Sequence, residues 1–294
     1  MTVLEALQHL RVDRRETLAR LGDLSDEHLE RHVGPDRPTD VRAAILALAQ
    51  EDDRRCVVLD GVLAALDWQP SEAQRMLPTL CATRARLRAM LVGIRDIDLD
   101  VHPDPSEWAI RETLRHLMGN EARFVEDSKY ATDRLRAGYA LPLQAPGEAT
   151  GPGSLGPELP GGVEVVLDSL ERIRDRLLKG ARSLTLEGLA APMPWAGLTV
   201  DVRFMLHRRA THERQHSVQI LKILRGMGRR QSEVQMLLAE ANIARGALES
   251  RVVGLPDDLL DRAPGADRPS VREILSQASA DEAAHVAAIL GAVS

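Results

Sequence analysis

An internal repeat constrains the fold of this chain more than any other feature of its sequence. In each of four copies an apolar residue is followed directly by arginine, and isoleucine or leucine stands three positions after that arginine. An acidic residue stands eleven positions after the apolar residue. The apolar residues are Val41, Ile110, Val202 and Val271, and the acids are Asp52, Glu121, Glu213 and Glu282. Each copy has helical periodicity, and a second amphipathic segment with a short polar joint precedes it. The repeat therefore predicts four helix pairs, about 1–68, 70–137, 163–229 and 231–294.

The arginine and the acid of each copy lie on predicted helices, where charged side chains most often form ion pairs. We expect each of them to pair with the other or with a neighbouring helix. Packing therefore explains most positions of the repeat.

The composition favours an all-α protein. Hydrophobic residues make up 44% of the chain but aromatic residues only 2%, so the core has to be built from leucine, alanine, valine and isoleucine. Leucine, alanine, glutamate and arginine are strong helix formers, and no segment alternates for long enough to predict a strand. We therefore expect an all-α fold.

One connection differs from the short polar joints. Residues 138–162 are rich in glycine and proline, which do not sustain a helix. A long segment of this kind predicts a crossover between the second and third helix pairs of a four-helix bundle. A cover over a site and a disordered linker remain alternatives.

Charge and cysteine usage exclude several classes of protein. The net charge is −6 and no run of lysine or arginine stands out, which excludes nucleic acid as the expected partner. No apolar run is long enough to span a bilayer, and the first ten residues lack the features of a signal peptide. Cys56 and Cys81 have no CxxC spacing and are expected to be buried free thiols. We expect a cytoplasmic protein without membrane or nucleic-acid partners.

Three histidines predict a metal site. His212 and His216 are four residues apart, which places both imidazoles on one face of a helix, about one turn apart. His116 lies six residues after the start of its repeat copy, on the inward side of that helix. Three histidine ligands leave a coordination position open, as in catalytic zinc sites. The sequence therefore predicts a divalent metal, zinc first, with nickel, iron or manganese as alternatives.

The segment from His212 to His216 also matches the HExxH signature of zinc proteases, in which the glutamate is the general base. No HxxGxxH extension follows, and the acid at the position of Glu213 recurs in copies without a histidine pair. A packing role for Glu213 is therefore favoured over a catalytic one, and a zinc hydrolase is the weaker alternative.

The outer copies of the repeat have lost the predicted site. Ala47 stands at the position of His116, Asp281 at that of His212, and His285 at that of His216. Only the second and third helix pairs together supply all three histidines.

These residues carry a resemblance to a known family. A tryptophan and the helix start Ile-Arg-x-x-Leu-x-His-Leu, followed later by His-x-x-x-His-x-x-Gln-Ile, resemble the DinB-like four-helix superfamily. That superfamily includes thiol-dependent S-transferases and mycothiol-dependent maleylpyruvate isomerases. The resemblance implies a metal-binding bundle at 70–229, and we expect 1–68 and 231–294 to pack together as a second, degenerate bundle. The matching residues are Trp108, Ile110, Arg111, Leu114, His116, Leu117, His212, His216, Gln219 and Ile220.

The expected function follows from the site and the resemblance together. A bound metal draws a thiol toward its thiolate form, which suits a thiol S-transferase or a thiol-assisted isomerase acting on a small electrophile. Such an enzyme would use a low-molecular-weight thiol as well as the metal. The predicted substrate contacts are Asn120, Arg123 and Arg209, with Arg111, Arg115 and Arg208 as further candidates, since arginine suits carboxylates.

Three further expectations can be tested. A non-catalytic metal-binding scaffold or sensor is the alternative from another functional class. Trp108 and Trp195, which flank helix starts, are expected to pack rather than to line a pocket. The flanking helix pairs are expected to replace a partner subunit and leave a monomer, with a homodimer as the alternative.

Overall fold

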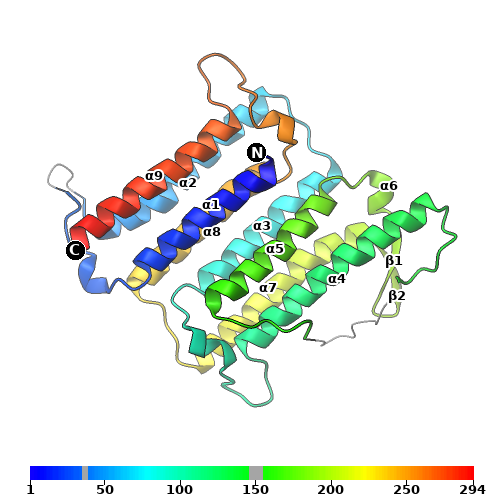
Figure 1. The fold of residues 1–294 in the computed structure, drawn as a ribbon, viewed down its shortest axis with the longest axis horizontal. Coiled ribbons are helices and arrows are strands. Elements are labelled where there is room, and N and C mark those ends of the chain that lie inside the picture. Colours follow the sequence, from blue (N-terminus) through cyan, green and yellow to red (C-terminus); the bar gives the residue numbers. More distant parts are fainter. Residues whose placement is uncertain (35–38, 146–154) are drawn as a thin grey trace. The chain divides into compact units, whose positions relative to one another are not determined.

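The computed structural model describes residues 1–34, 39–145 and 155–294, and this part of the chain is predominantly helical (Figure 1). Short 3-10 helices at Asp26–His28, Asp96–Asp100 and Asp257–Leu259 each lie in a connection between two α-helices. The all-α prediction is confirmed. The α-helices are α1 (Val3–Leu21), α2 (Val41–Ala65), α3 (Glu72–Met90), α4 (Ile110–Arg136), α5 (Val163–Ala181), α6 (Leu186–Leu189), α7 (Val202–Gly226), α8 (Glu233–Val252) and α9 (Val271–Val293).

The repeat marks the starts of four helices. The apolar residue that opens each copy is the first residue of α2, α4, α7 or α9. Asp40 accepts a hydrogen bond from the amide of Ala43 at 2.8 Å, and Asp201 accepts one from Phe204 at 2.7 Å. These N-caps satisfy amide groups that have no partner within the helix. Each copy of the repeat therefore begins where a helix begins.

The structure corrects one expectation, that the chain contains no strand. Strands β1 (Pro192–Trp195) and β2 (Leu198–Asp201) pair antiparallel just before α7. Ala196 and Gly197 connect them with φ angles of 49° and 80°, as in the two-residue turns that suit the twist of a hairpin. Four residues per strand are too few for an alternation to be visible in the sequence.

The contacts divide the chain into two compact units. Unit 1 comprises residues 1–70, 81–93 and 230–294, and unit 2 comprises 71–80 and 94–229. The expected division into a bundle at 70–229 and another of 1–68 with 231–294 stays a prediction. The grouping by contacts differs from it mainly at 81–93, the segment that contains the second half of α3.

Each unit has its own helix packing. In unit 1, α2 packs against α8 and α9, and α1 packs against α9. In unit 2, α4 packs between α5 and α7, and Ile110, Leu170 and Ile220 are completely buried there. Leucine, isoleucine, valine and alanine dominate the buried side chains, as the low aromatic content requires.

The repeated acids are buried in ion pairs with arginines of neighbouring helices. In unit 2, Glu121 and Glu213 both accept hydrogen bonds from Arg174, whose side chain is fully buried. Burial lowers the pKa of Arg174, but the attraction of the two carboxylates outweighs this effect and raises it. In unit 1, Asp52 and Glu282 accept hydrogen bonds from Arg14 and Arg245 in the same way.

The repeated arginines also pair with other helices and joints. Arg42 donates to Glu233 at 2.6 Å, Arg111 donates to Asp100 at 2.6 Å, and Arg203 pairs with Glu72. The expected pairing with neighbouring elements is confirmed. The buried arginines of the preceding helices were not predicted.

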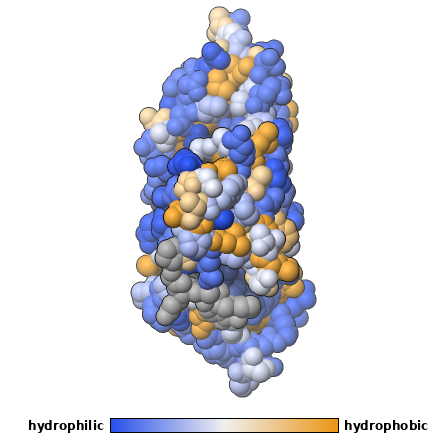
Figure 2. Space-filling view, turned by 90° about the vertical axis from the view of Figure 1, so that its right-hand side faces the viewer, coloured by the Kyte–Doolittle hydropathy of each residue, from blue (hydrophilic) through white to orange (hydrophobic). Residues whose placement is uncertain are grey.

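The surface of the molecule is mixed. On the face drawn in Figure 2, hydrophobic residues form small groups among hydrophilic ones. Among the described residues, no helix combines the length and the apolar character needed to cross a bilayer.

Candidate metal centre

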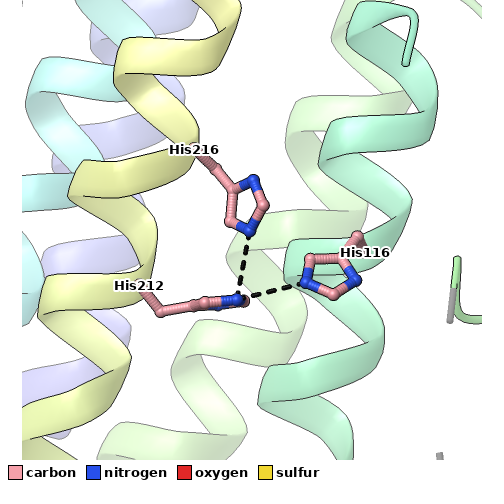
Figure 3. Close-up of side chains that lie close together, drawn as sticks. All are labelled: His116, His212 and His216. Atoms are coloured by element: carbon pink, nitrogen blue, oxygen red, sulfur yellow. Dashed lines mark hydrogen bonds between the residues drawn. The ribbon is translucent and has the colours of Figure 1, made fainter. Parts of the chain in front are cut away.

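Three histidine side chains of unit 2 converge from two helices. His116 extends from α4, and His212 and His216 extend from α7, with all three rings turned toward one another (Figure 3). The Nε2 atom of His212 lies 3.1 Å from Nε2 of His116 and 3.1 Å from Nε2 of His216. One ring nitrogen from each residue lies within 4.8 Å of the other two. The structure therefore brings together the three histidines that the sequence singled out.

Helical geometry accounts for this convergence. His212 and His216 lie one turn apart on α7, so their side chains leave the helix in nearly the same direction. His116 lies on the buried side of α4, which packs against α7. The contact between these two helices therefore determines how close His116 comes to the pair.

The hydrogen bonds around the cluster favour a shared cation. Nδ1 of His216 lies 2.8 Å from Oε1 of Gln219 and donates its proton there, which leaves the Nε2 lone pair available. Nε2 of His212 carries either a proton or a lone pair, so it cannot form good hydrogen bonds with both neighbouring imidazoles. A zinc ion with bonds of 2.0–2.1 Å in a tetrahedral arrangement separates its ligand nitrogens by about 3.4 Å. The two separations from His212 are close to that value, and the three side chains could hold such an ion.

Burial favours the neutral form of His212 and His216. Desolvation, together with the neighbouring His216 and Arg209, lowers the pKa of His212 to about 3. Burial also lowers the pKa of His216, although the hydrogen bond to Gln219 opposes this effect. Both rings are therefore in the neutral form that a metal requires at neutral pH.

Trp108 belongs to the surroundings of the cluster. Its indole centroid lies 4.9 Å from the ring of His116 and 6.1 Å from that of His216, with which it is stacked. The sequence predicts only a packing role for Trp108, and the structure shows that it packs against two of the three histidines. Trp195 packs against Phe204, at 5.2 Å between ring centroids.

The three predicted substrate contacts lie in different environments. Asn120 donates from Nδ2 to the carbonyl oxygen of His116 at 2.8 Å, and the same nitrogen lies 3.2 Å from Nε2 of that residue. Arg209 donates to the carbonyl oxygen of Asn120 at 3.1 Å and lies over the ring of Phe124. Arg123 pairs with Asp127 at 2.9 Å. A role in substrate binding stays a prediction for Asn120, Arg123 and Arg209.

Two of the further candidates hold a loop. Arg111 donates to the carbonyl oxygens of Leu159 and Gly161, and Arg115 donates to those of Gly156 and Pro157. The end of the glycine- and proline-rich segment thus lies along α4. Residues 146–154 of that segment, for which a crossover, a cover or disorder was considered, lie outside the described residues.

Glu213, which lies between the two histidines of α7 in sequence, forms a buried ion pair. Its side chain is completely buried, and its carboxylate accepts a hydrogen bond from Arg174 at 2.9 Å. Glu213, the glutamate of the HExxH match, therefore has the packing role that the sequence predicts for the repeated acid.

Comparison with known proteins supports the resemblance seen in the sequence. Residues 79–220 match the family model described as the DinB superfamily. No curated protein and no solved structure matches the chain. The matched segment contains His116, His212 and His216.

Proposed function

Through its residues 79–220 this chain belongs to the DinB superfamily, and on this premise we propose that it is a metal-dependent enzyme that transfers or uses a small thiol. The three converging Nε2 atoms of His116, His212 and His216 carry this proposal. The proposed reaction joins the thiol sulfur to a small electrophile, either as an S-transferase or as a thiol-assisted isomerase.

The chain would hold the metal through three neutral ligands. His116, His212 and His216 would bind through Nε2, and Gln219 would fix the tautomer of His216 by accepting its Nδ1 proton. Trp108 would restrict the orientations of two of the rings. A zinc ion held by three histidines leaves room for a further ligand and lowers the pKa of a coordinating thiol.

A thiol-transfer function is favoured over a zinc hydrolase. The HExxH mechanism needs the glutamate as a general base beside the metal. Here the carboxylate of Glu213 is buried and hydrogen-bonded to Arg174, so it is not available for proton transfer from a water molecule at the histidines.

The first test is metal binding. We expect chelator-treated protein to take up about one zinc ion per chain and to be stabilised by it, since a ligand at a hundred times its Kd adds about 2.7 kcal/mol to the free energy of unfolding. His212→Ala should abolish both effects. His207→Ala is the matched control, because His207 is an exposed histidine on the same helix and outside the cluster.

The second test is a screen of small thiols against small electrophiles, using protein loaded with zinc, nickel, iron or manganese. The proposal predicts conjugation or isomerisation that requires the metal and is lost in His212→Ala. Activity that survives in that variant would contradict it. Stoichiometric metal binding without any thiol reaction would instead support the scaffold or sensor alternative.

A further inference from the structure

Arg208 shares a face of α7 with the histidine pair. It precedes His212 by four residues, as His212 precedes His216, so the three side chains form one stripe along the helix. The positive charge of Arg208 contributes to the lowered pKa values of both histidines, which places its guanidinium within electrostatic range of the site. Any molecule bound at the three imidazoles therefore lies near a cation.

In the described part of the chain, the guanidinium of Arg208 has a buried nitrogen that lacks a partner, and it has no ion pair such as the one that Arg123 forms. Arg123 pairs with Asp127, and Arg209 donates to the carbonyl oxygen of Asn120. Nη1 of Arg208 is buried and has no hydrogen-bond partner among the described residues, and the same holds for Nε of Arg209. Burial lowers the pKa of Arg208. A buried donor of this kind costs free energy unless a ligand satisfies it.

The charge balance of the site points to an anion. Imidazole ligands without charge do not reduce the charge of a divalent ion, and Arg208 and Arg209 both contribute positive charge at His212. The acids near α7 are already engaged, because Glu121 and Glu213 bind Arg174 and Asp127 binds Arg123. A negatively charged ligand would therefore be attracted both by the metal and by the unsatisfied arginine.

We propose that Arg208 binds a carboxylate of the thiol substrate, so that the site selects thiols that carry a negative charge a few bonds away from their sulfur. This inference rests on the proposed function, because it requires a thiol at the three histidines. The planar guanidinium can hold a carboxylate through two parallel hydrogen bonds. Sulfur at the histidine cluster and carboxylate at Arg208 then fix both ends of the substrate.

The experiment compares two small thiols on cobalt-substituted protein. The carboxylate-bearing 3-mercaptopropionate and the neutral 2-mercaptoethanol are titrated at fixed pH, and the charge-transfer absorption between thiolate and cobalt reports binding without requiring turnover. The wild type should bind 3-mercaptopropionate at least about tenfold more tightly, as expected for a charge-assisted hydrogen bond. Arg208→Gln should remove this preference, because it should weaken the binding of 3-mercaptopropionate much more than that of 2-mercaptoethanol.

Arg214→Gln is the matched control, because it removes the same charge from an exposed position on the same helix; it should keep the preference. Arg208→Lys provides a second variant if Arg208→Gln fails to fold or to hold cobalt, and it should retain only part of the preference, because lysine lacks the planar fork. Equal affinity of the wild type for the two thiols would overturn the inference, as would a preference unchanged in Arg208→Gln or fully retained in Arg208→Lys. The absence of the thiolate absorption with either thiol would instead reject the proposed function, and the inference with it.

Discussion

Replacing Arg174 with methionine tests whether the repeated acids hold unit 2 together. The Arg174 side chain is fully buried and donates to Glu121 and Glu213, which are themselves almost completely buried. It also donates to the carbonyl oxygen of Leu80. Methionine is close in length to the aliphatic part of arginine, so the substitution mainly removes the charge and its hydrogen bonds.

The expected loss is large. Breaking a buried ion pair by removing one partner costs about 3–5 kcal/mol, because the charge of the other partner stays buried. Domains have a total free energy of unfolding of about 5–15 kcal/mol, so this loss is a substantial part of the stability. Arg176→Met is the control, since Arg176 is exposed on the same helix, and it should change the stability by less than about 0.5 kcal/mol.

The loss should also depend on pH. Without Arg174, burial raises the pKa values of Glu121 and Glu213 in the folded variant. The folded state then binds more protons than the unfolded state, so the free energy of unfolding falls as the pH rises above the ordinary pKa of glutamate. The difference between Arg174→Met and the wild type should therefore be larger at pH 7.5 than at pH 5.

Urea unfolding followed by circular dichroism measures the loss, and hydrogen exchange of the amides in α4, α5 and α7 locates it. The variant that combines Arg174→Met with Glu121→Met and Glu213→Met should recover part of the stability, because apolar residues can replace buried ion pairs. A loss below about 1 kcal/mol, or one equal to that of Arg176→Met, would refute the structural role of the acids.

Three further predictions concern the site and its surroundings. Gln219→Leu should weaken zinc binding by about tenfold or more, as the loss of a residue that orients a metal ligand usually does. A competition titration with a chelator measures this affinity. An unchanged affinity for zinc would mean that Gln219 does not orient His216. The free energy of unfolding of the metal-free wild type should fall as the pH falls below about 6.5, because the lowered pKa of His212 makes the unfolded state bind more protons than the folded state. Urea unfolding at several pH values should show that the stability of His212→Gln depends less steeply on pH. The same pH dependence in both proteins would contradict the lowered pKa of His212. Gly156→Ala should destabilise the loop along α4 by about 1–3 kcal/mol, since Gly156 has a φ of 69° and an added Cβ would lie 2.7 Å from the carbonyl oxygen of Arg115. Limited proteolysis should then cleave the segment 155–162 faster than in the wild type. An unchanged cleavage rate would argue against the close contact between this loop and α4.

Several elements of the fold could be predicted because their physical causes are local. The starts of α2, α4, α7 and α9 coincide with the copies of the repeat, since helix entry depends on a capping side chain and on the first turn. The β1–β2 hairpin was missed, because its four-residue strands depend on the Ala196-Gly197 turn rather than on a visible alternation.

The buried arginines show why packing charges are hard to predict. Arg174 lies among other charged residues in a helix whose pattern is equally consistent with an exposed arginine. Its burial results from Glu121 and Glu213, which are far away in the sequence and which approach only when α4, α5 and α7 pack together. The sequence indicates that the acids recur, but it does not identify their partner.

The candidate site also has some features that the sequence predicted and others that only the tertiary structure decided. The spacing of His212 and His216 placed them on one helical face, and alignment on the repeat added His116, because both inferences need only the period of a helix. The separation of 3.1 Å between Nε2 atoms, the stacking of Trp108 and the unsatisfied guanidinium of Arg208 were decided by tertiary structure. These features depend on how two helices and a preceding loop approach one another, and a helical period carries no information about that distance.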